Sequence, residues 1–144
     1  MATATFRQSI TVRYAETDQM GVAHHANYLL YLEDARTAYL KARAMPYGEL
    51  ERGGVGLPVR TVNVRYRQPA YYEDELEVAV WVEGARAASL TFGYRVTRSE
   101  ADGSETTLST ASVELACVDL SSMQPRAFPA QLLEFIDAER RDRG

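Results

Sequence analysis

The chain has 144 residues, of which 46% are hydrophobic and 25% are charged. This length and composition fit one globular domain over residues 1–144 and argue against disorder. The formal net charge of −4 argues against nonspecific nucleic-acid binding, which depends on clustered Lys and Arg.

The first half of the chain predicts a strand, a polar loop and a long helix. Residues 6–14 alternate between apolar and polar side chains, as in a strand. The polar stretch 15–26 follows and contains both histidines of the chain. From 28 to 42 apolar residues recur at steps of three and four, which predicts a helix of about four turns. We expect Asn27 to cap this helix, and Pro46 and Gly53-Gly54 to end it in an irregular connection.

The second half predicts four strands and a short helix. Runs with a period of two cover 61–67, 76–83 and 90–97. Asp102-Gly103 predicts a hairpin turn, and a last long strand is expected over about 106–120. Its alternation is less regular, so we expect either a β-bulge or a strand covered on both faces. A short amphipathic helix is expected after Pro129.

This order of elements predicts an α+β fold. A twisted antiparallel sheet can curl around one long helix, so we expect about five strands around a central helix, with a short C-terminal helix. The second face of the sheet is expected to carry Ala79, Trp81 and Ala111 and to need a partner that covers it.

The polar loop before the long helix collects the residue types of a hydrolytic site. Asp18 lies shortly before a predicted helix N-terminus, where free N–H groups and the helix dipole stabilise an anion. We interpret it as the candidate catalytic carboxylate, and Gly21 as the turn of the loop. His25 has two open interpretations: it hydrogen-bonds the carboxylate or the substrate, or it is a loop histidine with satisfied nitrogens. His24 is interpreted as structural.

Other kinds of site find little support. Two adjacent histidines without a Cys pair or a His-x-x-x-His spacing do not predict a metal site, and no cofactor is expected. There is no Gly-x-Ser-x-Gly elbow. The single cysteine, Cys117, excludes an internal disulfide and is interpreted as a core residue. No apolar run approaches the roughly 18 residues of a membrane span, and no signal peptide is evident, so we expect a cytoplasmic protein.

The stretch 12–28, Val-Arg-Tyr-Ala-Glu-Thr-Asp-Gln-Met-Gly-Val-Ala-His-His-Ala-Asn-Tyr, closely resembles the signature loop of hotdog-fold acyl-CoA thioesterases, in the 4-hydroxybenzoyl-CoA thioesterase and YbgC-type branch. The order of elements and the length agree across essentially the whole chain. The resemblance implies hydrolysis of acyl-CoA to a free acid and CoA. It also implies homodimers that pair their sheets side by side, with active sites at the interface, and that often pair further into homotetramers.

The resemblance also implies roles for single residues. Asp18 matches the catalytic carboxylate, which either attacks the thioester or activates water. His25 matches the histidine of the YbgC-type branch. Its backbone N–H matches the group that polarises the thioester carbonyl. Gly21 matches the glycine of the turn, and Tyr14 matches an aromatic residue near the site. Tyr28 is expected to line the substrate pocket.

Four further positions carry expectations. Glu16 and His24 stand where many relatives have Asp and Tyr, so they bear on substrate preference. Arg86 and Arg126 are the candidates for meeting the phosphates of CoA. The alternative function is a non-catalytic hotdog module that binds acyl-CoA or an acyl-carrier protein. A hotdog dehydratase would need a histidine as general base and a different loop, and the Asp-x-x-Gly pattern of this chain fits hydrolysis better.

Overall fold

The structure, a computed structural model, describes residues 5–143. The main sheet is antiparallel, with the strand order β1-β4-β5-β6-β3. Its strands are β1 (Phe6–Thr11), β3 (Val59–Tyr66), β4 (Glu75–Arg86), β5 (Ser89–Ser99) and β6 (Glu105–Ala116). Two short strands, β2 (Val55–Gly56) and β7 (Val118–Asp119), pair separately. The predicted five-stranded antiparallel sheet is confirmed.

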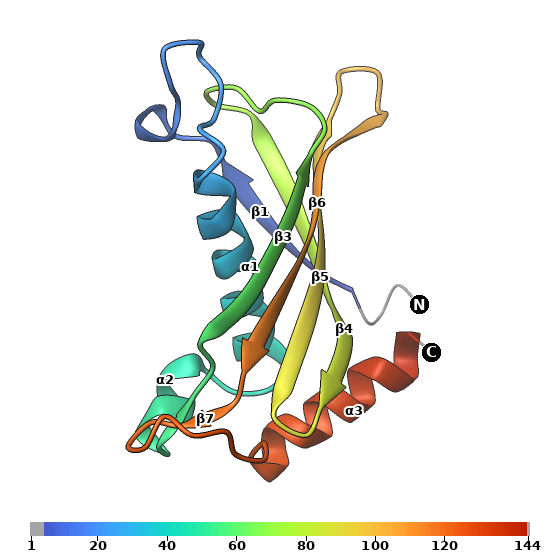
Figure 1. Ribbon diagram of the computed structural model, residues 1–144. Coiled ribbons are helices and arrows are strands. Elements are labelled where there is room, and N and C mark those ends of the chain that lie inside the picture. Colours follow the sequence, from blue (N-terminus) through green and yellow to red (C-terminus); the bar gives the residue numbers. More distant parts are fainter. Residues whose placement is uncertain (1–4, 144) are drawn as a thin grey trace.

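The long helix α1 (Asn27–Arg43) lies against one face of the twisted sheet, and α3 (Ala130–Arg143) closes one end (Figure 1). The core fills the space between α1, α3 and the sheet. The connection that we expected to be irregular contains a short helix, α2 (Tyr47–Arg52). None of the helices in residues 5–143 combines the length and the apolar character needed to cross a membrane.

The expected irregularity of the last long strand is a bulge. Val96 of β5 pairs with Ser109, whereas the next residue pairs with Thr107, so Leu108 is inserted as an extra residue. One inserted residue reverses the alternation of a strand, which is why Leu108 and Val113 are both buried. The strand also ends at Ala116, earlier than predicted.

This reversal corrects one expectation about the outer face of the sheet. Trp81 and Ala79 lie on neighbouring positions of the same face, as expected. Ala111 was wrongly assigned to that face. It pairs with Tyr94 and Val64 and packs against the core, because the bulge shifts the parity of β6.

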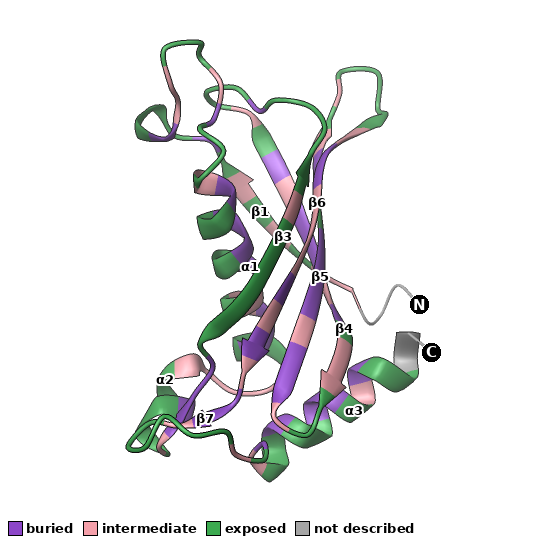
Figure 2. Cartoon of the chain, in the orientation of Figure 1, coloured by how far each residue is buried: buried purple, intermediate pink, exposed green. Residues whose placement is uncertain are grey.

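The edge strand β3 is exposed along nearly its whole length (Figure 2). Its apolar residues Val59, Val62 and Tyr66 point to the same face as the core, yet they are 46%, 42% and 46% exposed. The reason is the position of α1, which packs on β1 and β4 and leaves this side of the sheet open. Unpaired backbone groups beside an apolar row make β3 a surface for strand pairing.

Candidate active site

The loop between β1 and α1 folds back on itself at Gly21. Thr17 and Ala23 form an antiparallel bridge, and the N–H of Asp18 donates to the carbonyl of Val22 at 2.9 Å. Gly21 has a φ of 79°, a left-handed conformation that glycine adopts without strain. The turn predicted at this glycine is therefore present.

Asp18 occupies the start of this turn and is partly exposed. Its Oδ1 accepts a hydrogen bond from the N–H of Met20 at 2.8 Å. Within residues 5–143, its other oxygen accepts no hydrogen bond from the protein. One carboxylate oxygen thus orients the group, and the other is free to react with a substrate or a water molecule.

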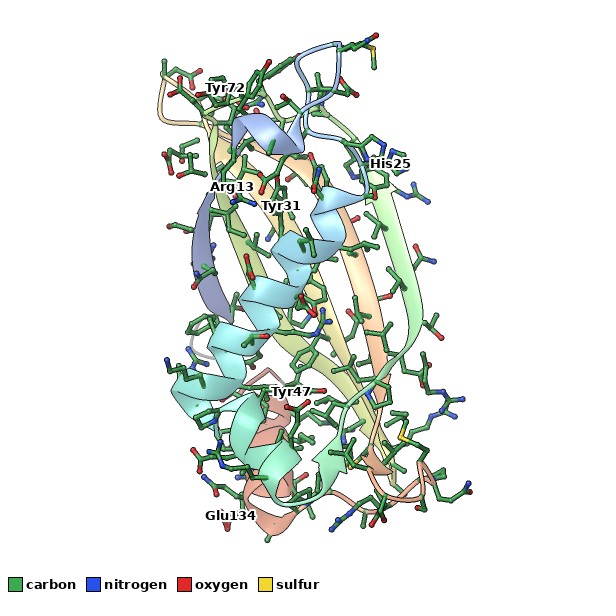
Figure 3. The ribbon with its side chains drawn as sticks, turned by 90° about the vertical axis from the view of Figure 1, so that its left-hand side faces the viewer. Arg13, His25, Tyr31, Tyr47, Tyr72 and Glu134 are labelled. Carbon is green, nitrogen blue, oxygen red and sulfur yellow. The ribbon has the colours of Figure 1, made fainter. Side chains whose placement is uncertain are left out.

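Glu16 is the buried centre of the loop. It is 7% exposed, and its carboxylate accepts hydrogen bonds from Arg13 N–H at 3.0 Å, Arg13 Nε at 2.9 Å and the Tyr31 hydroxyl at 2.8 Å. Figure 3 shows Arg13 and Tyr31 next to each other between the loop and α1. Burial raises the pKa of Glu16, but the hydrogen bonds and the charge of Arg13 outweigh it, so the pKa lies below its ordinary value. Glu16 is therefore an ionised anchor, a role that its sequence position did not reveal.

The backbone of Glu16 holds the start of α1. Its carbonyl accepts the N–H of His24 at 2.8 Å and the side-chain amide of Asn27 at 3.0 Å. The expectation that Asn27 caps the helix is therefore wrong: α1 begins at Asn27 itself, and its side chain turns to this loop carbonyl. The N–H of Ala26 is instead met by Nδ1 of His24 at 3.3 Å.

The backbone N–H of His25 is the free donor at the head of the helix. The amides of residues 24 and 26–29 all donate hydrogen bonds, whereas the amide of His25 meets no acceptor in the described part of the chain. The Tyr66 hydroxyl donates to the His25 carbonyl at 2.9 Å and so holds this peptide from β3. A fixed, free N–H at the positive end of a helix can stabilise negative charge that develops on an oxygen.

A cavity of about 260 Å³ adjoins this donor. Its lining comprises Ala23, His25, Tyr28, Tyr66, Arg67, Gln68 and Pro69. The ring of Tyr66 meets those of His25 and Tyr28 edge to face, with centroids 6.0 Å and 5.2 Å away. The structure thus brings Tyr28 and His25 together. The contribution of residues 67–69, in the connection after β3, was not foreseen, because no sequence pattern places a loop beside a helix start.

Other candidate residues lie outside this lining. Tyr14 is 77% exposed on a short 3-10 helix (Tyr14–Glu16), and its ring packs against Tyr72. Arg86 ends β4, and Arg126 follows β7, both at the end of the sheet opposite the head of α1 (Figure 1). Within one chain, these two arginines are therefore remote from His25.

The histidine pair and the acidic residues form no evident metal site. His24 stacks on His25 with ring centroids 4.4 Å apart. Within residues 5–143, no three His, Cys, Asp or Glu side chains are grouped so that they could hold a metal ion.

The family model of the Thioesterase-like superfamily matches residues 12–136. The chain belongs to this superfamily. Among its thioesterase relatives, the putative acyl-CoA thioesterase YneP of Bacillus subtilis is 36% identical over 85% of this chain and 89% of its own. The acyl-CoA thioester hydrolase YbgC of Escherichia coli is 35% identical over 92% of this chain and 96% of its own.

Solved thioesterase structures share the fold. The DHNA-CoA thioesterase of Staphylococcus aureus superimposes with a TM-score of 0.84 at 28% identity, covering 96% of this chain and 91% of its own. A 4-hydroxybenzoyl-CoA thioesterase mutant in complex with 4-hydroxybenzoyl-CoA superimposes with a TM-score of 0.83. At 19% identity over 92% of this chain and 99% of its own, it supports the fold alone. The hotdog fold and the thioesterase family inferred from the loop are confirmed.

Proposed function

We propose that the protein hydrolyses acyl-CoA thioesters to a free acid and CoA. The observation that carries this proposal is the free N–H of His25, fixed at the head of α1 beside a cavity. Asp18, on the turn of the same loop, supplies a carboxylate with one unengaged oxygen. The names of the YneP and YbgC relatives support the same reaction.

In this mechanism the thioester carbonyl oxygen accepts a hydrogen bond from the N–H of His25. Negative charge grows on that oxygen as the carbonyl carbon is attacked, and the amide and helix dipole stabilise it. Asp18 acts by one of two routes. As a nucleophile it bonds to the acyl carbon while the C–S bond breaks, and water then hydrolyses the mixed anhydride. As a general base it takes a proton from a water molecule that attacks the acyl carbon; the C–S bond then breaks, and the proton passes to the departing thiolate of CoA.

We further propose that two copies pair through their β3 strands. A two-fold axis near the middle of β3 makes the two strands antiparallel and extends the sheet. The same rotation turns the end of one copy that carries Arg86 and Arg126 toward the end of the other that carries His25. This supports a site to which the second copy contributes phosphate-binding arginines, and dimers can pair further into tetramers. We also propose that the protein is cytoplasmic.

The test is thiol release from a panel of acyl-CoA esters by the wild-type protein and by Asp18→Asn. Loss of the carboxylate is expected to lower turnover about 100-fold or more, with an unchanged circular dichroism spectrum. Asp102→Asn, in an exposed hairpin turn, is the matched control. Full activity of Asp18→Asn would contradict the site, and binding of acyl-CoA without thiol release would assign the non-catalytic role.

A further inference from the structure

A second cavity lies farther along α1, between this helix and the start of β3. The cavity beside His25 is bounded by Tyr28, in the first turn of α1, and by Tyr66, the last residue of β3. The second cavity, of about 380 Å³, is bounded by the middle of α1 and by Val59, the first residue of β3. Figure 3 labels His25 and Tyr47, which line the first and the second cavity, near the head of α1 and near its opposite end.

One stripe of α1 leads from the first turn of the helix to the second cavity. Leu29, Glu33, Arg36 and Leu40 follow one another at steps of four, three and four, so they share a face of the helix. Glu33, Arg36 and Leu40 line the second cavity. Leu29 precedes them on the stripe and is 43% exposed, so an apolar side chain lies on the helix surface ahead of the second cavity. At 1.5 Å per residue, Arg36 is about 12 Å along the axis from Tyr28. An extended acyl chain of medium length can span this separation.

Arg36 is a largely covered cation with few acceptors. Its side chain is 13% exposed, and the nearest carboxylate, that of Glu33, is 4.0 Å away on a side chain that is 59% exposed. Arg98, with 19% exposure, meets the carboxylates of Asp74 and Glu100 and the carbonyl of Pro69, all within 3.0 Å. A guanidinium has five N–H donors, and a buried charge without partners is unfavourable. Arg36 is therefore able to bind a further oxygen atom.

Two hydroxyls of the sheet are also poorly satisfied: Tyr94, next to Arg36, and Ser109, opposite Tyr66. The hydroxyls of Tyr94 and Ser109 are buried and complete no hydrogen bond of standard geometry with residues 5–143. Burial raises the pKa of Tyr94 to about 12, and both the positive charge of Arg36 and its hydrogen bonding to the phenol oppose this rise. The phenol is thus one partner of the guanidinium, which leaves its other N–H groups for a ligand. Buried polar groups without partners are uncommon in folded proteins.

We propose that this second cavity binds the far end of the acyl group, and that Arg36 selects acyl groups that carry an oxygen acceptor there. A hydroxyl or a carboxylate supplies such an oxygen. The apolar stretch at Leu29 accommodates the methylene chain between this oxygen and the thioester. The inference rests on the proposed hydrolysis of acyl-CoA and adds the substrate class.

The test compares octanoyl-CoA with its ω-hydroxy and ω-carboxy analogues. Affinities are measured by calorimetry on non-hydrolysable oxoalkyl thioether versions, and kcat/KM on the thioesters themselves. At least one oxygen-bearing analogue is expected to bind about 10-fold more tightly than the alkyl analogue, as suits a hydrogen bond to a charged donor. In Arg36→Met this ratio should fall to nearly one. Lys41→Met, which removes an exposed cation outside the cavity lining on the same helix, is the control and should retain the full ratio.

A second variant covers the case in which Arg36→Met does not fold. Thr37 is exposed and lines the cavity, so Thr37→Trp should fill it, weakening octanoyl-length analogues but not butanoyl ones. Equal affinity for all three octanoyl analogues, or no effect of either variant on them, would overturn this inference. Binding of the analogues without hydrolysis of any thioester would instead contradict the proposed function alone.

Discussion

The hydroxyl of Tyr66 donates a hydrogen bond of 2.9 Å to the backbone carbonyl of His25. Tyr66 is the last residue of the exposed edge strand β3, and the His25 amide is the free donor at the head of α1. The peptide that presents this donor is thus held by the strand that we expect to meet a second copy. Pairing of the edge and geometry of the site are mechanically linked.

Tyr66→Phe tests this link. The variant keeps the ring contacts with His25 and Tyr28 and removes only the hydroxyl. A neutral hydrogen bond contributes about 0.5–1.5 kcal/mol, so we expect kcat to fall about 2- to 10-fold. Steady-state kinetics measure the change in kcat. Tyr72→Phe is the control, because Tyr72 is half exposed and its ring packs on Tyr14 rather than on His25. An unchanged kcat in Tyr66→Phe would show that the hydroxyl does not hold the donor.

Glu16→Gln should lower both stability and turnover. The side-chain amide of glutamine cannot replace the Glu16 carboxylate, which accepts hydrogen bonds from Arg13 and Tyr31. This carboxylate fixes the loop segment whose backbone carbonyl accepts the N–H of His24. Hydrogen bonds to a charged group contribute about 1.5–3 kcal/mol, which is the loss expected in urea unfolding. We expect kcat to fall more than KM rises, since the His25 amide is mispositioned. In a double-mutant cycle with Tyr31→Phe, the changes in the free energy of unfolding should be non-additive, because the two side chains form one hydrogen bond with each other. Strict additivity would contradict the pairing.

The pH dependence of stability should carry the signature of Glu16. Its pKa in the folded protein is lowered from the ordinary value of 4.5, so the unfolded chain binds the proton more readily. The contribution to stability is therefore complete above pH 4.5 and is lost as the pH falls through the lower folded pKa. Urea unfolding across this acid range should show a steeper loss for wild type than for Glu16→Gln. Equal slopes would show that the fold does not lower the pKa of Glu16.

Val62→Lys should separate the proposed dimer. The side chain is 42% exposed on β3, so a monomer tolerates the charge, whereas two lysines near a two-fold axis repel each other. We expect a shift to monomer in sedimentation velocity, together with loss of thioesterase activity. Leu133→Lys, at a site 45% exposed on α3, is the control and should change neither the sedimentation nor the thioesterase activity. A Val62→Lys variant that sediments as wild type would place the interface elsewhere.

Glu139→Gln should destabilise the protein without altering the chemistry. This buried carboxylate of α3 accepts the Tyr39 hydroxyl at 2.6 Å and Arg43 at 2.8 Å, which fastens α3 to α1 far from the loop. Because Arg43 is partly exposed, the expected loss is that of hydrogen bonds to a charged group, about 1.5–3 kcal/mol in urea unfolding. The kcat per folded molecule should remain that of wild type. A large loss of kcat at full folding would reveal coupling between this end and the site.

The sequence by itself determined the order of elements, the sheet and the family. These depend on patterns that are local along the chain: a period of two for strands, steps of three and four for α1, and the loop from Val12 to Tyr28. Asp18 and Gly21 could be singled out for the same reason, since turn chemistry and proximity to a helix start are readable from neighbours.

Only the tertiary structure decided which groups act together. Glu16 looks like a neighbour of Asp18 in the sequence, but burial against Tyr31 makes it the anchor of the loop. The irregular alternation of β6 predicted either a bulge or a strand covered on both faces, and only the pairing with β5 showed that a bulge at Leu108 reverses which face the following residues occupy. The free N–H of His25 emerges only after every neighbouring amide has found its acceptor. Burial and hydrogen-bond pairing are properties of residues distant in sequence, so they exist only once the chain has folded.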